Sequence, residues 1–82
     1  MTRIFEKTQS FCGGCKATKL WLKKHGLVEG VDYVLESAED NLDMLAALGA
    51  QEAPVVVPDG APVFTGFRPD SLKALFRDTL EA

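Results

Sequence analysis

The stretch RIFEKTQSFCGGCKATKLWLKKH, residues 3–25, holds the most informative pattern in the chain. Arg3 to Thr8 is a short segment compatible with a β-strand, and the apolar spacing from about Cys15 to His25 predicts a helix. Gly26 is suited to end that helix, because glycine adopts a positive φ without steric cost. A pair of cysteines, Cys12 and Cys15, therefore stands where a strand gives way to a helix.

Outside this stretch the chain alternates between strand and helix patterns. Residues 31–35 predict a second strand, and Ser37-Ala38-Glu39-Asp40 resembles a capping box that opens a second helix, ended by Gly49. The β-branched run 55–57 predicts a buried strand, and residues 61–65 its return strand after a turn at 58–60. Pro69 and Asp70 suit the first turn of a last helix. The apolar stripes of the helices are Ala17, Leu20 and Trp21; then Leu42, Leu45 and Ala46, widened by Met44 and Leu48; and then Leu72, Leu75, Phe76 and Leu80.

The order of these elements is β-α-β-α-β-β-α. The first strand–helix–strand unit is expected to form a right-handed crossover between parallel strands, and the last two strands an antiparallel hairpin. Helices would then cover both faces of a four-stranded mixed sheet. The sequence thus predicts the α/β class and the outline of a thioredoxin-like fold.

Length and composition predict one compact domain over residues 1–82. Nine Lys and Arg against twelve Asp and Glu give a net charge of −3, which disfavours nucleic acid as a partner. No apolar run approaches the roughly 20 residues that span a bilayer, and the charged N-terminus does not resemble a signal peptide. We therefore expect a monomer in the reducing cytoplasm, with no membrane partner.

The Cys-x-x-Cys pair predicts dithiol–disulfide chemistry. A thiolate attacks disulfides, whereas a free cysteine with a pKa of about 8.5 is mostly protonated at neutral pH. The positive end of the helix and the free N–H groups of Gly14 and Cys15 can stabilise an anion on Cys12. We therefore expect Cys12, at the exposed edge, to be the nucleophile, and Cys15, one turn inward, to resolve the mixed disulfide. Gly13 and Gly14 leave the sulfurs open to a protein disulfide.

Two other roles for the cysteines are weaker. A structural disulfide across four residues restricts the unfolded chain by only about 2 kcal/mol. A zinc site usually needs four ligands, and only His25 remains to join the pair, so a metal would have to be shared between two subunits. His25 is expected instead to interact with the negative end of its helix. No metal and no cofactor beyond the Cys12–Cys15 disulfide are expected.

Several short motifs, taken together, resemble one family of redox proteins. They are Cys12-Gly13-Gly14-Cys15 followed by Ala17-Thr18, then Ala47-Leu48-Gly49, Ala53-Pro54-Val55-Val56-Val57 and Gly66-Phe67-Arg68-Pro69-Asp70. Their order resembles that of the NrdH-type redoxins, glutaredoxin-sized proteins with thioredoxin-like reactivity, over nearly the whole chain. The Gly-Phe-Arg-Pro-Asp block is the most specific motif, because the Cys pair alone marks only the thioredoxin superfamily.

The resemblance implies an electron donor for ribonucleotide reductase in deoxyribonucleotide synthesis, re-reduced by thioredoxin reductase rather than by glutathione. It also implies a cis peptide between Ala53 and Pro54, facing the Cys pair, where the Ala53 backbone would pair with an extended substrate segment. Phe11, Phe64 and Phe67 are expected to form an apolar collar around the sulfurs. The residues expected to contact substrate or partner are Phe11, Gly13, Gly14, Ala53, Pro54, Thr65, Gly66, Phe67 and Arg68.

Three alternatives remain open. A glutathione-dependent glutaredoxin would carry a Gly-Gly and paired-Asp segment at 66–70, where Phe67 would crowd glutathione and Pro69 lacks an N–H donor. An iron–sulfur scaffold would need two chains that share their Cys pairs, and a redox-sensing module would exchange disulfides without turnover. Glu6 is a further candidate, either as a proton acceptor for Cys15 or, more simply, as a solvated charge at the strand end.

Overall fold

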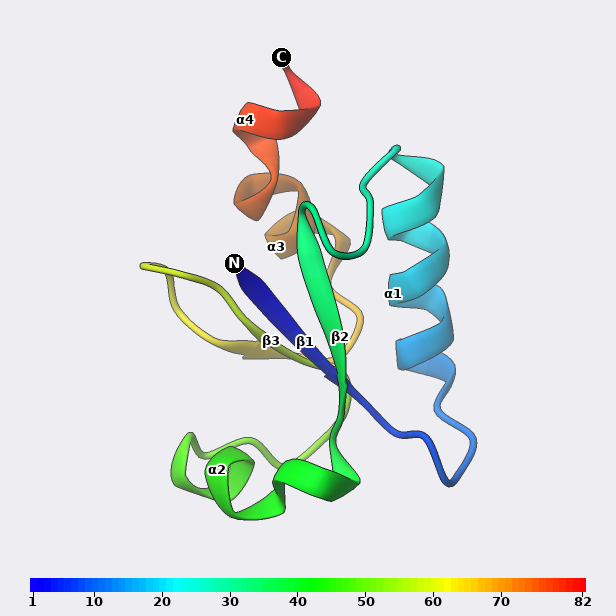
Figure 1. The fold of residues 1–82 in the computed structure, drawn as a ribbon, viewed down its shortest axis with the longest axis vertical. Coiled ribbons are helices and arrows are strands. Elements are labelled where there is room, and N and C mark those ends of the chain that lie inside the picture. Colours follow the sequence, from blue (N-terminus) through cyan, green and yellow to red (C-terminus); the bar gives the residue numbers. More distant parts are fainter.

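The computed structural model describes all 82 residues and contains one four-stranded mixed sheet flanked by helices (Figure 1). The strands are β1 (Thr2–Glu6), β2 (Tyr33–Ser37), β3 (Val55–Val57) and β4 (Phe64–Thr65), in the order β2-β1-β3-β4. The helices are α1 (Gly13–Lys24), α2 (Leu42–Ala47), α3 (Pro69–Leu75) and α4 (Arg77–Leu80), and a 3-10 turn, η1 (Glu39–Asn41), precedes α2. As predicted, β1 and β2 are parallel, and β3 and β4 are antiparallel.

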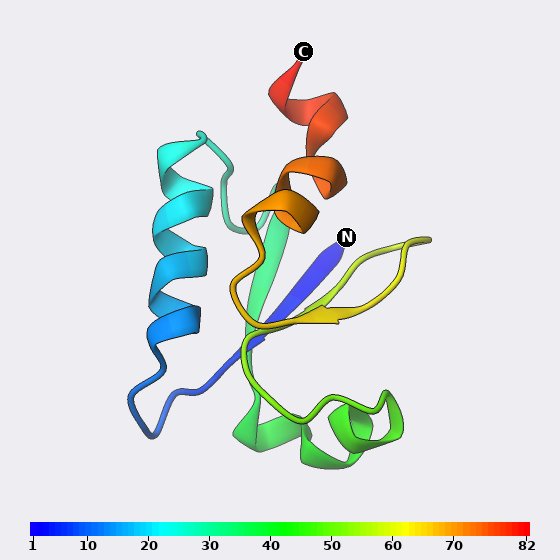
Figure 2. The same cartoon turned by 180° about the vertical axis from the view of Figure 1, so that it is seen from behind.

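Side chains alternate between the two faces of the sheet, so that each face has its own core. Ile4 on β1 pairs with Val56 on β3, and both belong to a cluster with Leu22 of α1 and Leu72 of α3. The adjacent residues on these strands turn to the other face, where they form a second cluster that includes Leu45 of α2. Helices α1 and α3 therefore cover one face and α2 the other (Figures 1 and 2).

The buried stripe of α1 differs from the predicted one. Cys15, Thr18 and Leu22 are its buried residues, at i, i+3 and i+7, whereas Leu20 is 68% exposed and Trp21 is half-buried against the core. Periodicity alone favoured the larger apolar residues, because it could not show that a cysteine and a threonine would face the sheet. In the same way, Leu45 is buried in α2 while Leu42 and Leu48 are exposed.

Several boundaries shift for local reasons. The second strand begins at Tyr33 rather than at residue 31, because a carboxylate oxygen of Asp32 accepts the amide of Val28 at 2.7 Å and closes a turn there. The return strand is reduced to Phe64–Thr65, since Pro62 has no N–H for the ladder. The predicted last helix is divided at Phe76 into α3 and α4. No helix has both the length and the apolar character to cross a membrane.

Candidate active site

Cys12 is the N-cap residue of α1. Its backbone is extended, and the amide of Cys15 donates a hydrogen bond to its sulfur over 3.1 Å. The amide of Gly14, which was expected to donate as well, makes no such bond. No acidic residue lies in the first turn, and Lys16 is its first charged residue. The site therefore favours negative charge on Cys12 through one direct donor and the positive end of the helix.

The two cysteines form a disulfide and differ in exposure. Their Cα atoms are 5.2 Å apart, within the usual range for disulfides. Cys15 is 3% exposed, whereas Cys12 is half-buried at the surface. A thiol of another molecule can therefore approach the sulfur of Cys12 more readily than that of Cys15, which fits an outer nucleophile and an inner resolving thiol.

The loop before β3 faces the Cys pair. Its Ala53–Pro54 peptide is cis, as the resemblance implied, and the carbonyl oxygen of Ala53 lies 3.8 Å from the Cys12 sulfur. The buried Pro54 accepts a hydrogen bond from the amide of Gly66 at 2.9 Å. Gly66 has a φ of +79°, a conformation that favours glycine. The start of β3, the loop at Gly66 and the first turn of α1 thus meet at one end of the sheet.

The two glycines between the cysteines have different surroundings. A Cβ atom added at Gly13 would meet the ring of Phe11 at 3.6 Å, an ordinary contact. A Cβ atom added at Gly14 would lie only 3.1 Å from Cδ of Pro54. Gly14 therefore gives α1 room to approach the loop at Pro54 closely, whereas Gly13 is exposed and has space for a side-chain atom. Both glycines are expected to leave the sulfurs open to a partner, and Gly14 in addition lies against the loop at Pro54.

The remaining residues of the expected partner surface are distributed unevenly. Phe11 is 80% exposed and Phe67 39% exposed, and the backbone nitrogen of Phe67 lies beside Gly14. Phe64, in contrast, packs against the core cluster that includes Ile4, which leaves Phe11 and Phe67 as the exposed members of the expected apolar collar. Arg68 lines a separate hollow together with Phe64.

Two glutamates that the sequence did not mark as functional hold the loops of the site. Glu39 accepts hydrogen bonds from the amides of Thr8 at 3.0 Å and Gln9 at 3.2 Å and from the Thr8 hydroxyl at 3.0 Å. These bonds lower the pKa of Glu39 to about 2, the Thr8 amide contributing most. Glu52 accepts the hydroxyl of Thr65 at 3.1 Å. No sequence pattern indicated these pairings, because the residues are far apart in the chain.

Glu6, at the end of β1, is neither free nor solvated. Its side chain is 15% exposed, and its carboxylate pairs with the ammonium of Lys19 on α1 at 2.7 Å. This differs from the expected solvated charge, and no hydrogen bond joins Glu6 to Cys15. The pair links β1 to α1 one turn beyond the cysteines.

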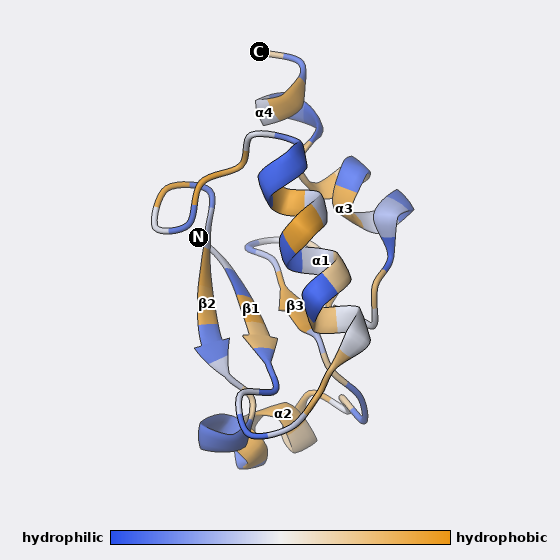
Figure 3. Ribbon diagram, turned by 90° about the vertical axis from the view of Figure 1, so that its right-hand side faces the viewer, coloured by the Kyte–Doolittle hydropathy of each residue, from blue (hydrophilic) through white to orange (hydrophobic).

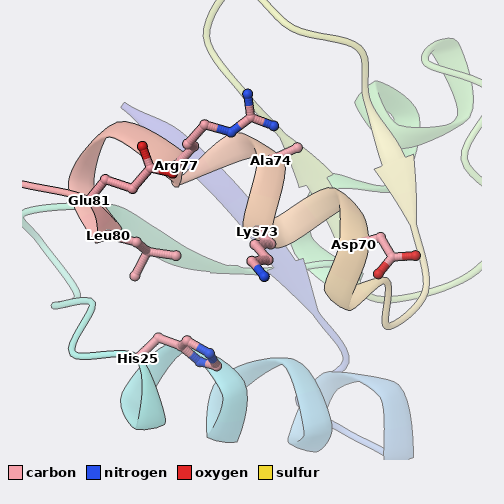
Figure 4. Close-up of a pocket in the computed structure, with 7 residues that line it drawn as sticks. All are labelled: His25, Asp70, Lys73, Ala74, Arg77, Leu80 and Glu81. Carbon is pink, nitrogen blue, oxygen red and sulfur yellow. The ribbon is translucent and has the colours of Figure 1, made fainter.

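The largest hollow, about 680 Å³, lies away from the sulfurs, between the end of α1 and the pair α3–α4 (Figure 4). His25 stacks on Trp21 there, with ring centroids 3.9 Å apart, and its Nδ1 lies 2.8 Å from the Trp21 carbonyl oxygen. His25 thus interacts with the end of its helix, as expected. Lys73 points toward His25, whereas Arg77 and Asp70 point away, so these side chains do not converge on one point.

No group of three or more His, Cys, Asp and Glu side chains gathers where it could hold a metal ion.

The four-stranded sheet with its flanking helices is a thioredoxin-like fold, and together with the Cys pair it defines a thiol–disulfide oxidoreductase. Among solved structures, the chain is similar to the glutaredoxin-like protein NrdH-redoxin from Escherichia coli, whose structure is described as the basis of its thioredoxin-like activity profile. The two are 27% identical, the match covers 90% of this chain and 92% of that one, and the TM-score is 0.74. The resemblance to NrdH-type redoxins is thereby confirmed. No protein-family model and no curated protein matches the chain.

Proposed function

We propose that this protein carries reducing equivalents, as the Cys12–Cys15 dithiol, from thioredoxin reductase to ribonucleotide reductase in the cytoplasm. The observation that carries this proposal is the half-buried sulfur of Cys12 at the N-cap of α1, opposite the Ala53 carbonyl. The similarity to a redoxin with a thioredoxin-like activity profile supports the choice of reductase. The protein is proposed to act as a monomer.

The exchange proceeds in two displacements. The thiolate of Cys12 attacks one sulfur of the partner's disulfide, whose S–S bond breaks, and the other partner sulfur leaves with the electron pair and takes up a proton. Cys15 then loses its proton and attacks the Cys12 sulfur. This step releases the second partner sulfur as a thiol and leaves the Cys12–Cys15 disulfide, so that two electrons have passed to the partner.

The surface around Cys12 suits an extended protein segment. The backbone of Ala53 lies beside the sulfur, so a segment that pairs with it would present its disulfide to Cys12. Phe11 and Phe67 supply exposed apolar surface that a partner protein can contact. Gly13, Pro54, Thr65, Gly66 and Arg68 remain proposed contacts of this surface.

The test is turnover of NADPH with thioredoxin reductase and oxidised ribonucleotide reductase, comparing the wild type with Cys12→Ser and Cys15→Ser. Cys12→Ser should be inactive, and Cys15→Ser should accumulate mixed disulfides. Equal loss in both variants without trapping would contradict the assigned roles. If turnover in a glutathione-coupled assay were as fast as turnover with thioredoxin reductase, the protein would instead act as a glutaredoxin.

A further inference from the structure

The charges of α1 differ in sign from those of the chain as a whole. The helix contains four lysines and no acidic residue, although the net charge of the protein is −3. The net negative charge therefore lies entirely outside this helix. Lys16, Lys19 and Lys23 recur at i, i+3 and i+7, which places them along one side of α1. Figure 3 shows this helix from its outer side, with hydrophilic and hydrophobic residues intermixed.

A groove of about 340 Å³ runs along this side of α1, next to β2. Its lining includes the three lysines, Leu20, Glu29, Tyr33 and Leu35. Lys19 is paired with Glu6, but Lys16 and Lys23 make no ion pair. Leu20 is 68% exposed between them. The groove thus combines two lysines without ion pairs and an apolar contact at Leu20 with a single acidic residue, Glu29, and we call it the lysine groove.

We propose that the lysine groove docks an acidic extended segment of the protein disulfide substrate, with an apolar side chain over Leu20. The inference rests on the proposed disulfide exchange and adds a preference among substrates. The groove begins at Lys16, directly after Cys15, and the Lys16 ammonium lies 5.6 Å from the ring of the exposed Phe11. A segment that presents its disulfide to Cys12 can therefore continue along α1.

The Ala53 side of the sulfurs has no comparable row of lysines, and the hollow next to Ala53 is lined by one acidic and one basic residue, Glu52 and Lys7. Glu52 lies directly before Ala53, and the only hydrogen bond to its carboxylate comes from Thr65. An acidic flank is therefore favoured on the α1 side, where lysines predominate, over the Ala53 side, where Glu52 and Lys7 balance each other. Charge complementarity of this kind raises association rates and fixes the orientation of the partner.

The test uses synthetic peptides with the same central disulfide and acidic, neutral or basic residues on one flank. We expect the reduced protein to react with the acidic peptide roughly tenfold faster than with the basic one at low ionic strength. The difference should vanish in about 1 M salt, where the Debye length is about 3 Å. Self-association is monitored by native mass spectrometry. A dimer that dissociates when the lysines are substituted would show that a second copy of the chain, rather than a substrate segment, occupies the groove.

Lys16→Gln combined with Lys23→Gln should abolish the preference for the acidic over the basic peptide, each rate being divided by the rate of the same variant with the neutral peptide. Lys73→Gln combined with Arg77→Gln removes the same amount of charge from another face of the protein, and this control variant should retain the preference for the acidic peptide. Equal rates for all three peptides would overturn the docking proposal, whereas failure to reduce even the neutral peptide would overturn the proposed function itself.

A second observation concerns Thr18, whose hydroxyl is buried without any hydrogen-bond partner. The residue is 1% exposed and lies one turn after the buried Cys15, on the same face of α1. Helical side chains lean toward the N-terminus, so the Thr18 side chain lies over the turn that carries Cys15. A buried hydroxyl without a partner is unfavourable and calls for an explanation.

We infer that the Thr18 hydroxyl donates a hydrogen bond to the Cys15 sulfur once the disulfide is opened. In the disulfide, that sulfur is bonded to Cys12 and carries no charge. In the mixed disulfide, Cys15 must become a thiolate in a buried setting that disfavours charge. A donor there stabilises the thiolate and speeds its attack on Cys12.

The test compares Thr18→Val, which has the same shape without the hydroxyl, with Thr18→Ser, which retains it. Thr18→Val should raise the pKa of Cys15, measured by alkylation in the Cys12→Ser background, by about 1, equivalent to a tenfold smaller thiolate fraction. It should slow resolution of the mixed disulfide by roughly threefold, because the thiolate of higher pKa is scarcer but more nucleophilic, and it should leave the first attack by Cys12 unchanged. Thr18→Ser should resolve the mixed disulfide as fast as the wild type. The inference would be overturned if Thr18→Val resolved the mixed disulfide as fast as the wild type. It would also be overturned if Thr18→Ser resolved it as slowly as Thr18→Val.

Discussion

Replacing Gly14 by alanine should destabilise the protein and slow its reaction, whereas the same change at Gly13 should not. Alanine is favoured over glycine by up to about 1 kcal/mol inside a helix, and because both positions lie in the first turn of α1, any such gain is common to both. At Gly13 the new methyl group meets the Phe11 ring at an ordinary 3.6 Å. At Gly14 it would lie 3.1 Å from Cδ of Pro54, which is fully buried and has little room to move.

Overpacking of this kind costs about 1–3 kcal/mol. Gly13→Ala should therefore be neutral or slightly stabilising, and Gly14→Ala should be less stable than Gly13→Ala by about 1–3 kcal/mol, since the shared helix gain cancels. The carbonyl oxygen of Ala53, next to Pro54, lies 3.8 Å from the Cys12 sulfur. A displaced Pro54 loop therefore moves the surface that receives the substrate, and turnover should fall by roughly tenfold in Gly14→Ala only.

Both variants are measured by denaturant unfolding of the oxidised protein and by turnover with a disulfide substrate. The wild type provides the baseline, and Gly13→Ala controls for helix propensity. If Gly14→Ala proved as stable and as active as Gly13→Ala, the close approach between α1 and the Pro54 loop would not matter for either property.

Three further predictions follow from single contacts. The Glu39 carboxylate, with a pKa lowered from 4.5 to about 2, should stabilise the fold above pH 4.5 and lose that effect as the pH falls toward 2. An NMR titration of the Glu39 side chain and of the Thr8 amide measures this pKa, and a value near 4.5 would contradict the prediction. Leu22→Ala, at a site with 0% exposure, should cost about 2–5 kcal/mol in denaturant unfolding, and a loss below about 1 kcal/mol would mean that α1 is not anchored by this residue. Glu6→Gln should leave the pH profile of turnover unchanged, because Lys19 already engages the carboxylate; a displaced profile would revive the proton-relay role.

The sequence predicted the architecture because strong local signals agreed with one another. The β-branched run at Val55–Val57 and the glycines after each of the first two helices gave the right elements in the right order. Gly26 and Gly49 have φ values of 74° and 76°, the conformation expected of helix-ending residues. The Cys pair was placed correctly at the start of α1, although the helix begins two residues earlier than its apolar spacing indicated.

What the sequence did not predict depends on contacts between distant residues. Leu20 fits an apolar stripe, yet the side of α1 that carries Thr18 and Leu22 is the buried one. The rotation of α1 about its own axis is therefore decided by packing against the sheet rather than by hydropathy. The hydrogen bonds from Thr8 to Glu39 join residues that are 31 positions apart in the chain, so no local pattern predicts them. The difference between Gly13 and Gly14 likewise arises only when the Pro54 loop folds against α1.

The most direct test of the central claim is a titration of the Cys12 thiol in the reduced protein, followed by thiolate absorbance and by alkylation rate. The amide of Cys15 and the end of α1 should lower the pKa of Cys12 from the ordinary value of about 8.5 to about 7, below that of Cys15 measured in Cys12→Ser. A Cys12 thiol that titrates near its ordinary value, or no more easily than Cys15, would contradict the account.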